Sequence, residues 1–276
     1  MQDADNGTGS HDGGAFASCA PPDLAPWVEL IWYSRGTLPA SRERVLPSAT
    51  CDIVVNLGAP MTLLEGAGVR RFTGATTSGL LTRPLLLEHP HVHEALGFRL
   101  TPAGIRALAH APAAAVLDLN AMLGDVCGAA ARELEDRCAS ARSGAEVLGV
   151  AVTWARERCR TAPAVDPLAT WAMQRIVASA GAVRVEALQE RSGYGPTRFR
   201  QRFVDELGVS PRAFASLVRL RVTLDGLATT TPLVELALAA GYADQAHMNR
   251  EVRRFTGLTP ARVRERQQGS ALTLPE

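Results

Sequence analysis

One pattern of residues occurs twice in the C-terminal part of the chain, and it restricts the possible folds more than any other feature. The first copy consists of Leu188, Gly193-Tyr194, Phe199, Phe203 and Gly208-Val209-Ser210-Pro211. The second copy consists of Leu236, Gly241-Tyr242, Met248, Val252 and Gly257-Leu258-Thr259-Pro260. The offset is 48 residues up to the Gly-Tyr pair and 49 residues after it. Because so many positions agree in register, we interpret this region as one structural unit that is repeated.

Each copy contains the residues that a helix-turn-helix needs. Gly193 and Gly241 each follow a short helical pattern, and glycine readily adopts the positive φ that reverses the chain sharply. Pro196 suits the first turn of the next helix in the first copy, and Asp244 is a suitable capping residue in the second. The repeat therefore predicts two helix-turn-helix units.

The second helix of each unit is expected to be amphipathic. Its buried stripe recurs about every four residues and comprises Phe199, Phe203 and Leu207, then Met248, Val252 and Phe255. The opposite faces carry Thr197, Arg200, Gln201 and Val204 in the first copy, and Ala246, His247, Asn249, Arg250 and Arg253 in the second. Arginine matches guanine, asparagine and glutamine match adenine, and small apolar groups match the thymine methyl. We predict that both faces read DNA bases; the alternative for each is an ordinary solvated surface.

The distance between the two units suits a DNA duplex. Residues 211–228 predict one connecting helix of about 18 residues, which is roughly 27 Å long at ~1.5 Å per residue. With the offset of the recognition helices themselves, these helices are expected about one DNA turn apart, ~34 Å. One chain would then enter two successive major grooves. We expect phosphate contacts, which position the protein without specifying sequence, from Arg198, Arg253, Arg254 and Arg262.

The distribution of charge agrees with double-stranded DNA as the partner. The chain contains no lysine, so arginine supplies every fixed positive side-chain charge. Residues 1–183 contain 15 Arg and 18 acidic residues, whereas residues 184–268 contain 14 Arg and 9 acidic residues. A C-terminal region with a net charge of +5 on a slightly acidic body is typical of a nucleic-acid-binding module attached to another domain.

These motifs resemble those of the AraC/XylS family of bacterial transcription regulators. The resemblance covers about residues 168–266 and is carried by Ser192-Gly193-Tyr194, Arg198–Phe203, Gly208-Val209-Ser210-Pro211, Ala237–Asn249, Arg250 and Phe255–Pro260. It implies a seven-helix DNA-binding domain. By motif position, it implies base readout by Thr197, Arg200 and Gln201 in the first unit and by Ala246, His247 and Arg250 in the second.

The chain departs from the family pattern at four positions. Met248 and Val252 stand where the second recognition helix often has an aromatic residue. Thr223 and Gly226 stand in the connecting helix, where alanine and leucine are usual. Since glycine costs about 1 kcal/mol relative to alanine inside a helix, the sequence puts the last turn of the connecting helix in question.

We expect an α+β N-terminal domain followed by an all-α domain of two helix-turn-helix units joined by a connecting helix. The expected boundaries are a disordered tail at 1–20, a mixed α/β domain at 21–160, a linker at 161–167, the DNA-binding domain at 168–268 and a tail at 269–276. Strands are predicted at 45–47, 51–57, 85–87 and 94–100, and a hairpin at 61–64 and 69–72. Helices are predicted at 102–109 and 117–159, with an interruption near 140–144.

The first domain also resembles a domain found attached to such regulators, through Val45–Gly58 and Leu96–Leu108. The family resemblance implies that this part senses a small-molecule effector or forms a homodimer. If the protein activates transcription, RNA polymerase is a further expected partner.

Three histidines allow a different interpretation of the first domain. His89, His91 and His93 alternate along the chain, so an extended strand would place their imidazoles on one face, where a transition metal could bind. The alternative is a polar edge or loop, which Pro90 favours. A metal-binding sensor or an enzyme-like domain fused to a helix-turn-helix therefore stays open, as does a helical interaction module that does not bind DNA.

Other observations exclude several classes of protein. The motifs of nucleophilic hydrolases, zinc proteases and nucleotide-binding loops are absent, so we expect neither an enzyme nor a cofactor. The five cysteines, which include no Cys-x-x-Cys pair, argue against a disulfide framework and a thiolate zinc site. No apolar run approaches the ~18 residues of a membrane helix. We therefore expect a cytoplasmic, sequence-specific DNA-binding regulator.

Overall fold

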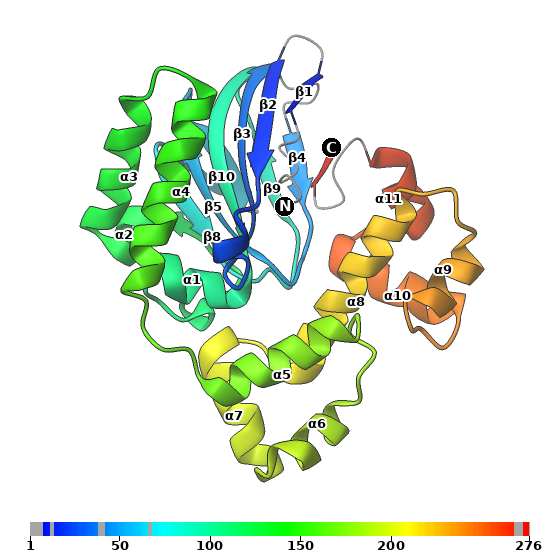
Figure 1. Cartoon of the computed structure of the whole chain (residues 1–276). Coiled ribbons are helices and arrows are strands. Elements are labelled where there is room, and N and C mark those ends of the chain that lie inside the picture. The colour runs from blue at the N-terminus through cyan, green and yellow to red at the C-terminus, as the bar shows by residue number, and fades with distance from the viewer. Residues whose placement is uncertain (1–7, 12–13, 38–41, 66–67, 268–272, 276) are drawn as a thin grey trace. The chain divides into compact units, whose positions relative to one another are not determined.

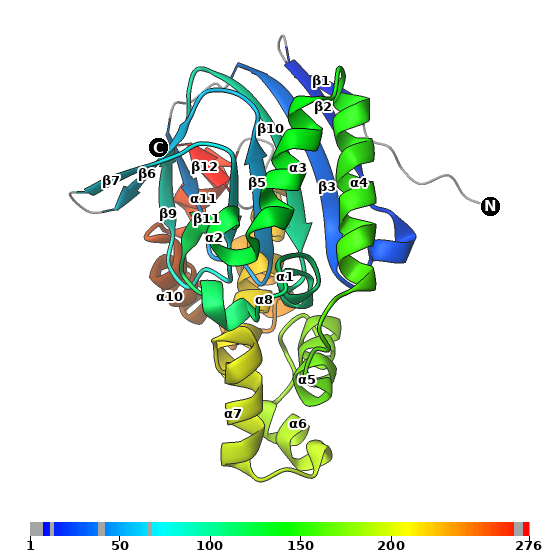
Figure 2. The ribbon, with the colours of Figure 1, turned by 90° about the vertical axis from the view of Figure 1, so that its left-hand side faces the viewer.

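The computed structural model describes residues 8–11, 14–37, 42–65, 68–267 and 273–275, and the chain forms two compact units (Figures 1 and 2). Unit 1 comprises Met1–Arg42, Thr50–Gly79 and Leu87–Ala164, and unit 2 comprises Glu43–Ala49, Leu80–Leu86 and Val165–Glu276. The predicted order of a β-rich region followed by a helical region is confirmed. Unit 2 also contains two short segments from the N-terminal half, which the sequence pattern did not predict.

Unit 1 is built on an antiparallel sheet in which β10 is the long central strand. The strand order is β1-β2-β3-β10-β5-β8-β11, with β1 at Thr8–His11, β2 at Gly14–Cys19, β3 at Val28–Thr37, β5 at Cys51–Asn56, β8 at Ala75–Ser78, β10 at Val92–Leu100 and β11 at Asn120–Met122. In β5 the side chains of Cys51, Ile53 and Val55 are buried and the residues between them are partly exposed. This period of two is why the segment forms a strand with one face in the core.

Helices cover one face of this sheet. They are η1 (Pro22–Leu24), α1 (Pro102–Ala109), η2 (Ala113–Val116), α2 (Leu123–Cys127), α3 (Ala129–Ala139) and α4 (Gly144–Arg160). Figure 2 shows α3 and α4 side by side in front of β3 and β10. Trp154 of α4 is fully buried, its ring centroid lies 5.6 Å from that of Phe98 in β10, and its indole N–H donates to the Ala130 carbonyl at 3.1 Å. Both its apolar and its polar part are therefore satisfied.

Several predicted strands form close to their expected positions. The predicted hairpin is confirmed as β6 (Met61–Glu65) paired with β7 (Gly68–Phe72), and β9 occupies Leu85–Glu88. The strand expected at 45–47 is instead β4, at Arg42–Val45. Leu46, which follows it, is buried in the core of unit 2.

Both expected tails contain strands in their described parts. Residues 14–19 form β2, which pairs with β3 from Ala15 opposite Arg35 to Cys19 opposite Ile31. At the other end, β12 (Thr273–Pro275) pairs with β4, and Leu274 is fully buried. The polar, glycine-rich composition of the N-terminal end suggested a loose chain, but in both ends pairing with another strand satisfies backbone groups of the described residues.

Unit 2 contains seven helices in its described part. They are α5 (Pro167–Ala178), α6 (Val185–Ser192), α7 (Pro196–Leu207), α8 (Pro211–Leu227), α9 (Leu233–Ala239), α10 (Gln245–Thr256) and α11 (Pro260–Arg266). Helix α8 is the predicted connecting helix. It packs on α5 and α7 toward one end and on α9 and α11 toward the other (Figure 1).

Candidate nucleic-acid interface

The two turns of unit 2 form as the repeat predicts. Gly193 and Gly241 have φ of 72° and 77°, in the left-handed region that favours glycine. Helix α7 begins at Pro196, and Asp244 caps α10 by accepting a hydrogen bond from the His247 amide at 2.6 Å. Each helix-turn-helix therefore has its second helix starting directly after the turn.

The apolar stripes of α7 and α10 are buried as predicted. Phe199, Phe203 and Leu207 are each at most 2% exposed, and Phe203 packs against Phe214 of α8 with ring centroids 5.9 Å apart. In α10 the corresponding Met248, Val252 and Phe255 are at most 5% exposed. Burial of these stripes leaves the opposite face of each helix in solvent.

The predicted base-reading residues divide into an exposed set and a partly buried set. The exposed residues are Thr197, Arg200 and Gln201 in α7 and Ala246 and Arg250 in α10. Gln201 donates to Asp205 at 2.6 Å within its own helix.

The partly buried set consists of two residues of α10. His247 lies edge-on to the buried Tyr242 ring, with centroids 5.3 Å apart. The Asn249 side-chain oxygen is buried and has no hydrogen-bond partner among the described residues. The helical pattern alone did not indicate the partial burial of His247, because it involves Tyr242, which precedes α10.

The four predicted phosphate-contacting arginines are all exposed. The Arg198 guanidinium lies 5.2 Å from the centre of the Tyr194 ring. Arg254 pairs with Glu251 at 3.2 Å and lies 4.2 Å from the Phe255 ring centre, and Arg262 pairs with Glu265 at 2.8 Å. Both members of the Arg262–Glu265 pair are exposed, so this pair is weak and exchanges readily for a phosphate.

Sequence reasoning missed one residue on each recognition helix that points inward. In α7, Arg202 donates to the Asp166 carboxylate at 2.7 Å and to the Tyr194 hydroxyl at 3.0 Å. Burial acts to raise the pKa of Asp166, but the hydrogen bonds from Arg202 and from the Ala169 amide outweigh it and lower that pKa. In α10, Glu251 pairs with Arg219 at 3.7 Å. Arg202 and Glu251 occupy equivalent positions of the two repeats, and this equivalence could have identified them from the sequence.

The structure explains both departures in the connecting helix. Gly226 lies inside the last turn of α8, and a Cβ there would lie 2.3 Å from Cδ1 of Leu236 in α9. Thr223 is fully buried and donates to the Arg219 carbonyl at 2.8 Å. Small size at 226 and a satisfied hydroxyl at 223 therefore fit this packing, and the helix continues through both.

The three histidines do not form a cluster in the structure. Strand β9 ends at Glu88, the chain bends at His91, and only His93 lies within β10, where its Nε2 is 2.8 Å from the Ser34 hydroxyl. Among the described residues, no three His, Cys, Asp or Glu side chains are placed to hold a metal ion. The extended segment that would have aligned the imidazoles is interrupted next to Pro90.

Unit 1 has a polar cavity of about 480 Å³ between the sheet and the ends of α3 and α4. The Tyr33 hydroxyl donates to Glu94 at 2.8 Å in this cavity, and Arg35 lies 3.7 Å from the same carboxylate. Desolvation, followed by the hydrogen bond to Glu94, raises the pKa of Tyr33 to about 12. A Cβ on Gly144 would lie 2.5 Å from the Tyr33 ring, so glycine lets α4 begin directly above it.

Two domain families match the chain. Residues 188–266 match a family described as a helix-turn-helix domain, and residues 19–121 match a domain of unknown function, DUF6597. No curated protein sequence matches. Within the described part of the chain, no helix is long and apolar enough to cross a membrane.

Several solved structures are similar to parts of this chain or to most of it. The C-terminal domain of AraT, a response regulator from Geobacillus stearothermophilus, is 22% identical over 39% of this chain and 92% of that chain, with a TM-score of 0.37. The xylose-binding transcription activator XylR is 22% identical over 37% of this chain and 27% of that chain, with a TM-score of 0.34. An apo variant of ToxT from Vibrio cholerae is 10% identical over 85% of this chain and 97% of that chain, with a TM-score of 0.50, which indicates a shared fold.

Proposed function

We propose that this chain is a DNA-binding transcription regulator whose C-terminal helix-turn-helix domain is of the AraC type, and that it places α7 and α10 in two successive major grooves. One observation carries the proposal: two helices with exposed polar faces are joined by α8, which has 17 residues. At ~1.5 Å per residue such a helix is about 26 Å long. Since one chain holds both helices, two-groove binding does not require a dimer.

The exposed side chains of α7 and α10 suggest which bases each helix contacts. Arg200 and Gln201 of α7 and Arg250 of α10 have the donors that match guanine and adenine edges in the major groove. Thr197 and Ala246 at the starts of the helices suit contact with a thymine methyl. His247 and Asn249 are partly buried, so we expect them to contact bases only at the periphery of the interface between α10 and the DNA.

Selection of duplexes from a random pool by the full-length protein tests this proposal. We expect enrichment of two short submotifs about one helical turn apart, ~10 base pairs. Enrichment of one submotif would mean that only one helix reads bases. Absence of any enrichment, with protein that is folded by circular dichroism, would favour the interaction-module alternative.

The cavity of unit 1 supports a second proposal, namely that this unit binds a polar small molecule as an effector. Its lining includes the cationic Arg35 and Arg142 and the anionic Glu94 and Glu135. Its volume lies in the range of small-molecule sites. A ligand with both donors and acceptors fits this lining better than an apolar one does.

We further place the regulator in the bacterial cytoplasm, where its operator lies.

Thermal unfolding in the presence of free amino acids, sugars and short carboxylic acids tests the effector proposal. A ligand of the cavity should raise the Tm of the wild type and of Asp136→Asn, an exposed position of α3 outside the cavity. It should raise the Tm of Glu94→Gln much less. Equal shifts in all three proteins would place the binding site elsewhere.

A further inference from the structure

Arg202 and Glu251 occupy the same position of the two repeats, 49 residues apart, and both point inward from a recognition helix. Arg202 of α7 pairs with Asp166, the residue that caps α5. Glu251 of α10 pairs with Arg219 in the middle of α8. Each recognition helix is thus tied to its support by an ion pair from the equivalent residue, with the signs of the charges reversed.

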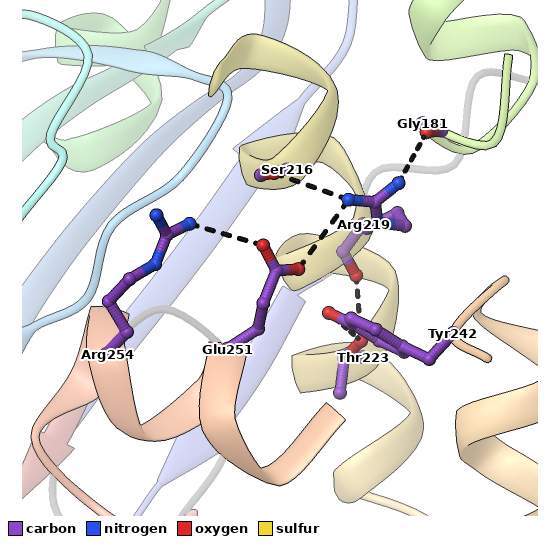
Figure 3. A network of polar contacts seen from close by, with 7 residues as sticks. All are labelled: Gly181, Ser216, Arg219, Thr223, Tyr242, Glu251 and Arg254. Atoms are coloured by element: carbon purple, nitrogen blue, oxygen red, sulfur yellow. Dashed lines mark hydrogen bonds and ion pairs between the residues drawn. The ribbon is translucent and has the colours of Figure 1, made fainter. Parts of the chain in front are cut away.

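The second of these pairs belongs to a larger network around Arg219 (Figure 3). One guanidinium nitrogen of Arg219 donates to the Gly181 carbonyl at 3.2 Å, and the other donates to the Ser216 hydroxyl at 3.3 Å and lies 3.7 Å from Glu251. The guanidinium carbon is 5.6 Å from the centre of the Tyr242 ring. These contacts approach one rigid, planar group from different directions, so they fix its orientation.

The partners of Arg219 come from both halves of the DNA-binding unit. Gly181 lies in the turn after α5, three residues beyond Ala178, and α5 supports the first helix-turn-helix, whereas Tyr242 and Glu251 belong to the second. Figure 3 shows the Arg219 side chain between the Gly181 loop and the Glu251 side chain of α10. A single side chain therefore contacts the support of the first reading helix and the second reading helix itself.

Close packing leaves this network little freedom. A Cβ on Gly181 would lie 2.3 Å from the Ala215 carbonyl and 2.9 Å from Cγ of Arg219, so the loop lies directly on α8. The side chains of Arg219 and Glu251 are 21% and 13% exposed, and Tyr242 is 3% exposed. Charges this far out of water interact strongly and are costly to leave unpaired.

We propose that Arg219 is a positioning residue that sets the spacing and angle between α7 and α10, and thereby the separation of the two submotifs that the protein accepts. The inference rests on the proposed two-groove binding. Arg219 contacts Gly181, Ser216, Tyr242 and Glu251 rather than the exposed reading residues of α7 and α10. We therefore expect it to affect the separation of the two submotifs and not the base preference of each helix.

The experiment uses full-length protein and duplexes that carry the two selected submotifs at separations changed in steps of one base pair. A duplex with a single submotif measures each helix alone. The variants are Arg219→Gln, the conservative Arg219→Lys, and Glu251→Gln, which removes the opposite charge. Arg221→Gln is the matched control, because Arg221 lies on the same helix but pairs with Asp225 of that helix at 3.1 Å.

We expect the wild type and Arg221→Gln to bind one separation at least tenfold more tightly than its neighbours. Arg219→Gln and Glu251→Gln should lose most of this preference for one separation, and they should bind the duplex with a single submotif within about twofold of wild type. The preference of Arg219→Lys should lie between that of Arg219→Gln and that of wild type. If the variants lower the Tm but keep the wild-type preference for separation, Arg219 is only structural and the inference is wrong. If Arg219→Gln does not fold, the same comparison is decided by Arg219→Lys and Glu251→Gln. A wild type without any preference for separation would instead refute two-groove binding itself.

Discussion

The Leu236 side chain occupies the space that a Cβ at Gly226 would need. Cδ1 of Leu236 would lie only 2.3 Å from that Cβ. Leu236 is 5% exposed, and it joins α9 to the core formed with Leu224 and Leu227 of α8. The glycine that looks unfavourable in the sequence therefore allows α8 and α9 to approach closely. Its helix propensity and its packing have opposite effects on stability.

From this relationship we predict that Gly226→Ala destabilises the protein. Alanine gains about 1 kcal/mol of helix propensity, but overpacking of a close-packed core typically costs about 1–3 kcal/mol. Because buried Leu236 has little room to move, we expect a net loss of about 1 kcal/mol in the free energy of unfolding. Urea unfolding followed by circular dichroism measures it.

Gly149→Ala is the matched control for this measurement. Gly149 lies in the middle of α4, and a Cβ there would meet nothing within 4 Å. The same change should therefore stabilise the protein by up to about 1 kcal/mol. If both variants are stabilised, Leu236 adapts without cost and the packing argument fails.

Leu274→Ala should reveal that the C-terminal strand is part of the fold. Leu274 is fully buried in the core of unit 2, although the sequence suggested a tail there. Removing a buried leucine side chain typically costs about 2–5 kcal/mol. Leu238→Ala, at a position of α9 that is 62% exposed, should change stability by less than about 0.5 kcal/mol. Equal small effects of the two changes would show that β12 contributes little.

Asp166 should make the stability of unit 2 depend on pH in the acid range. Its pKa is lowered in the folded protein, so its contribution is fully present above the unfolded value of about 4 and is lost as the pH falls through the lower folded value. Asp166→Asn should therefore cost about 1–2 kcal/mol at pH 7 and much less at pH 2. Asp205→Asn, the same change at an exposed position of α7, is the matched control. If the free energy of unfolding of wild type and of Asp166→Asn differs by the same amount at all pH values, the ionised Asp166 carboxylate is not what stabilises the fold.

The sequence predicted features that depend on local chemistry and missed those that depend on distant segments. The helix ends at Gly193 and Gly241 were predictable, because a positive φ is a local requirement that glycine meets. The pairing of Thr273–Pro275 with β4 was not, because it joins segments more than 200 residues apart. Similarly, the pattern of α10 placed His247 on the reading face but carried no information about its contact with the Tyr242 ring.

Arg250 and Arg253 give the sharpest test of how α10 meets DNA. Both are exposed and lie in the same helix, yet by their positions we expect Arg250 to face bases and Arg253 to face a phosphate. Arg250→Ala should cost about 1–3 kcal/mol on the preferred operator and relax preference at one base pair, since a bidentate guanine contact is lost. Arg253→Ala should weaken binding to all sequences alike and reduce the salt dependence by about one phosphate contact. Binding titrations at several salt concentrations, on the operator and its single-base variants, separate the two roles. If Arg250→Ala also lowers affinity equally on every sequence, α10 approaches the backbone rather than the base edges, and readout must then come from the start of the helix around Ala246.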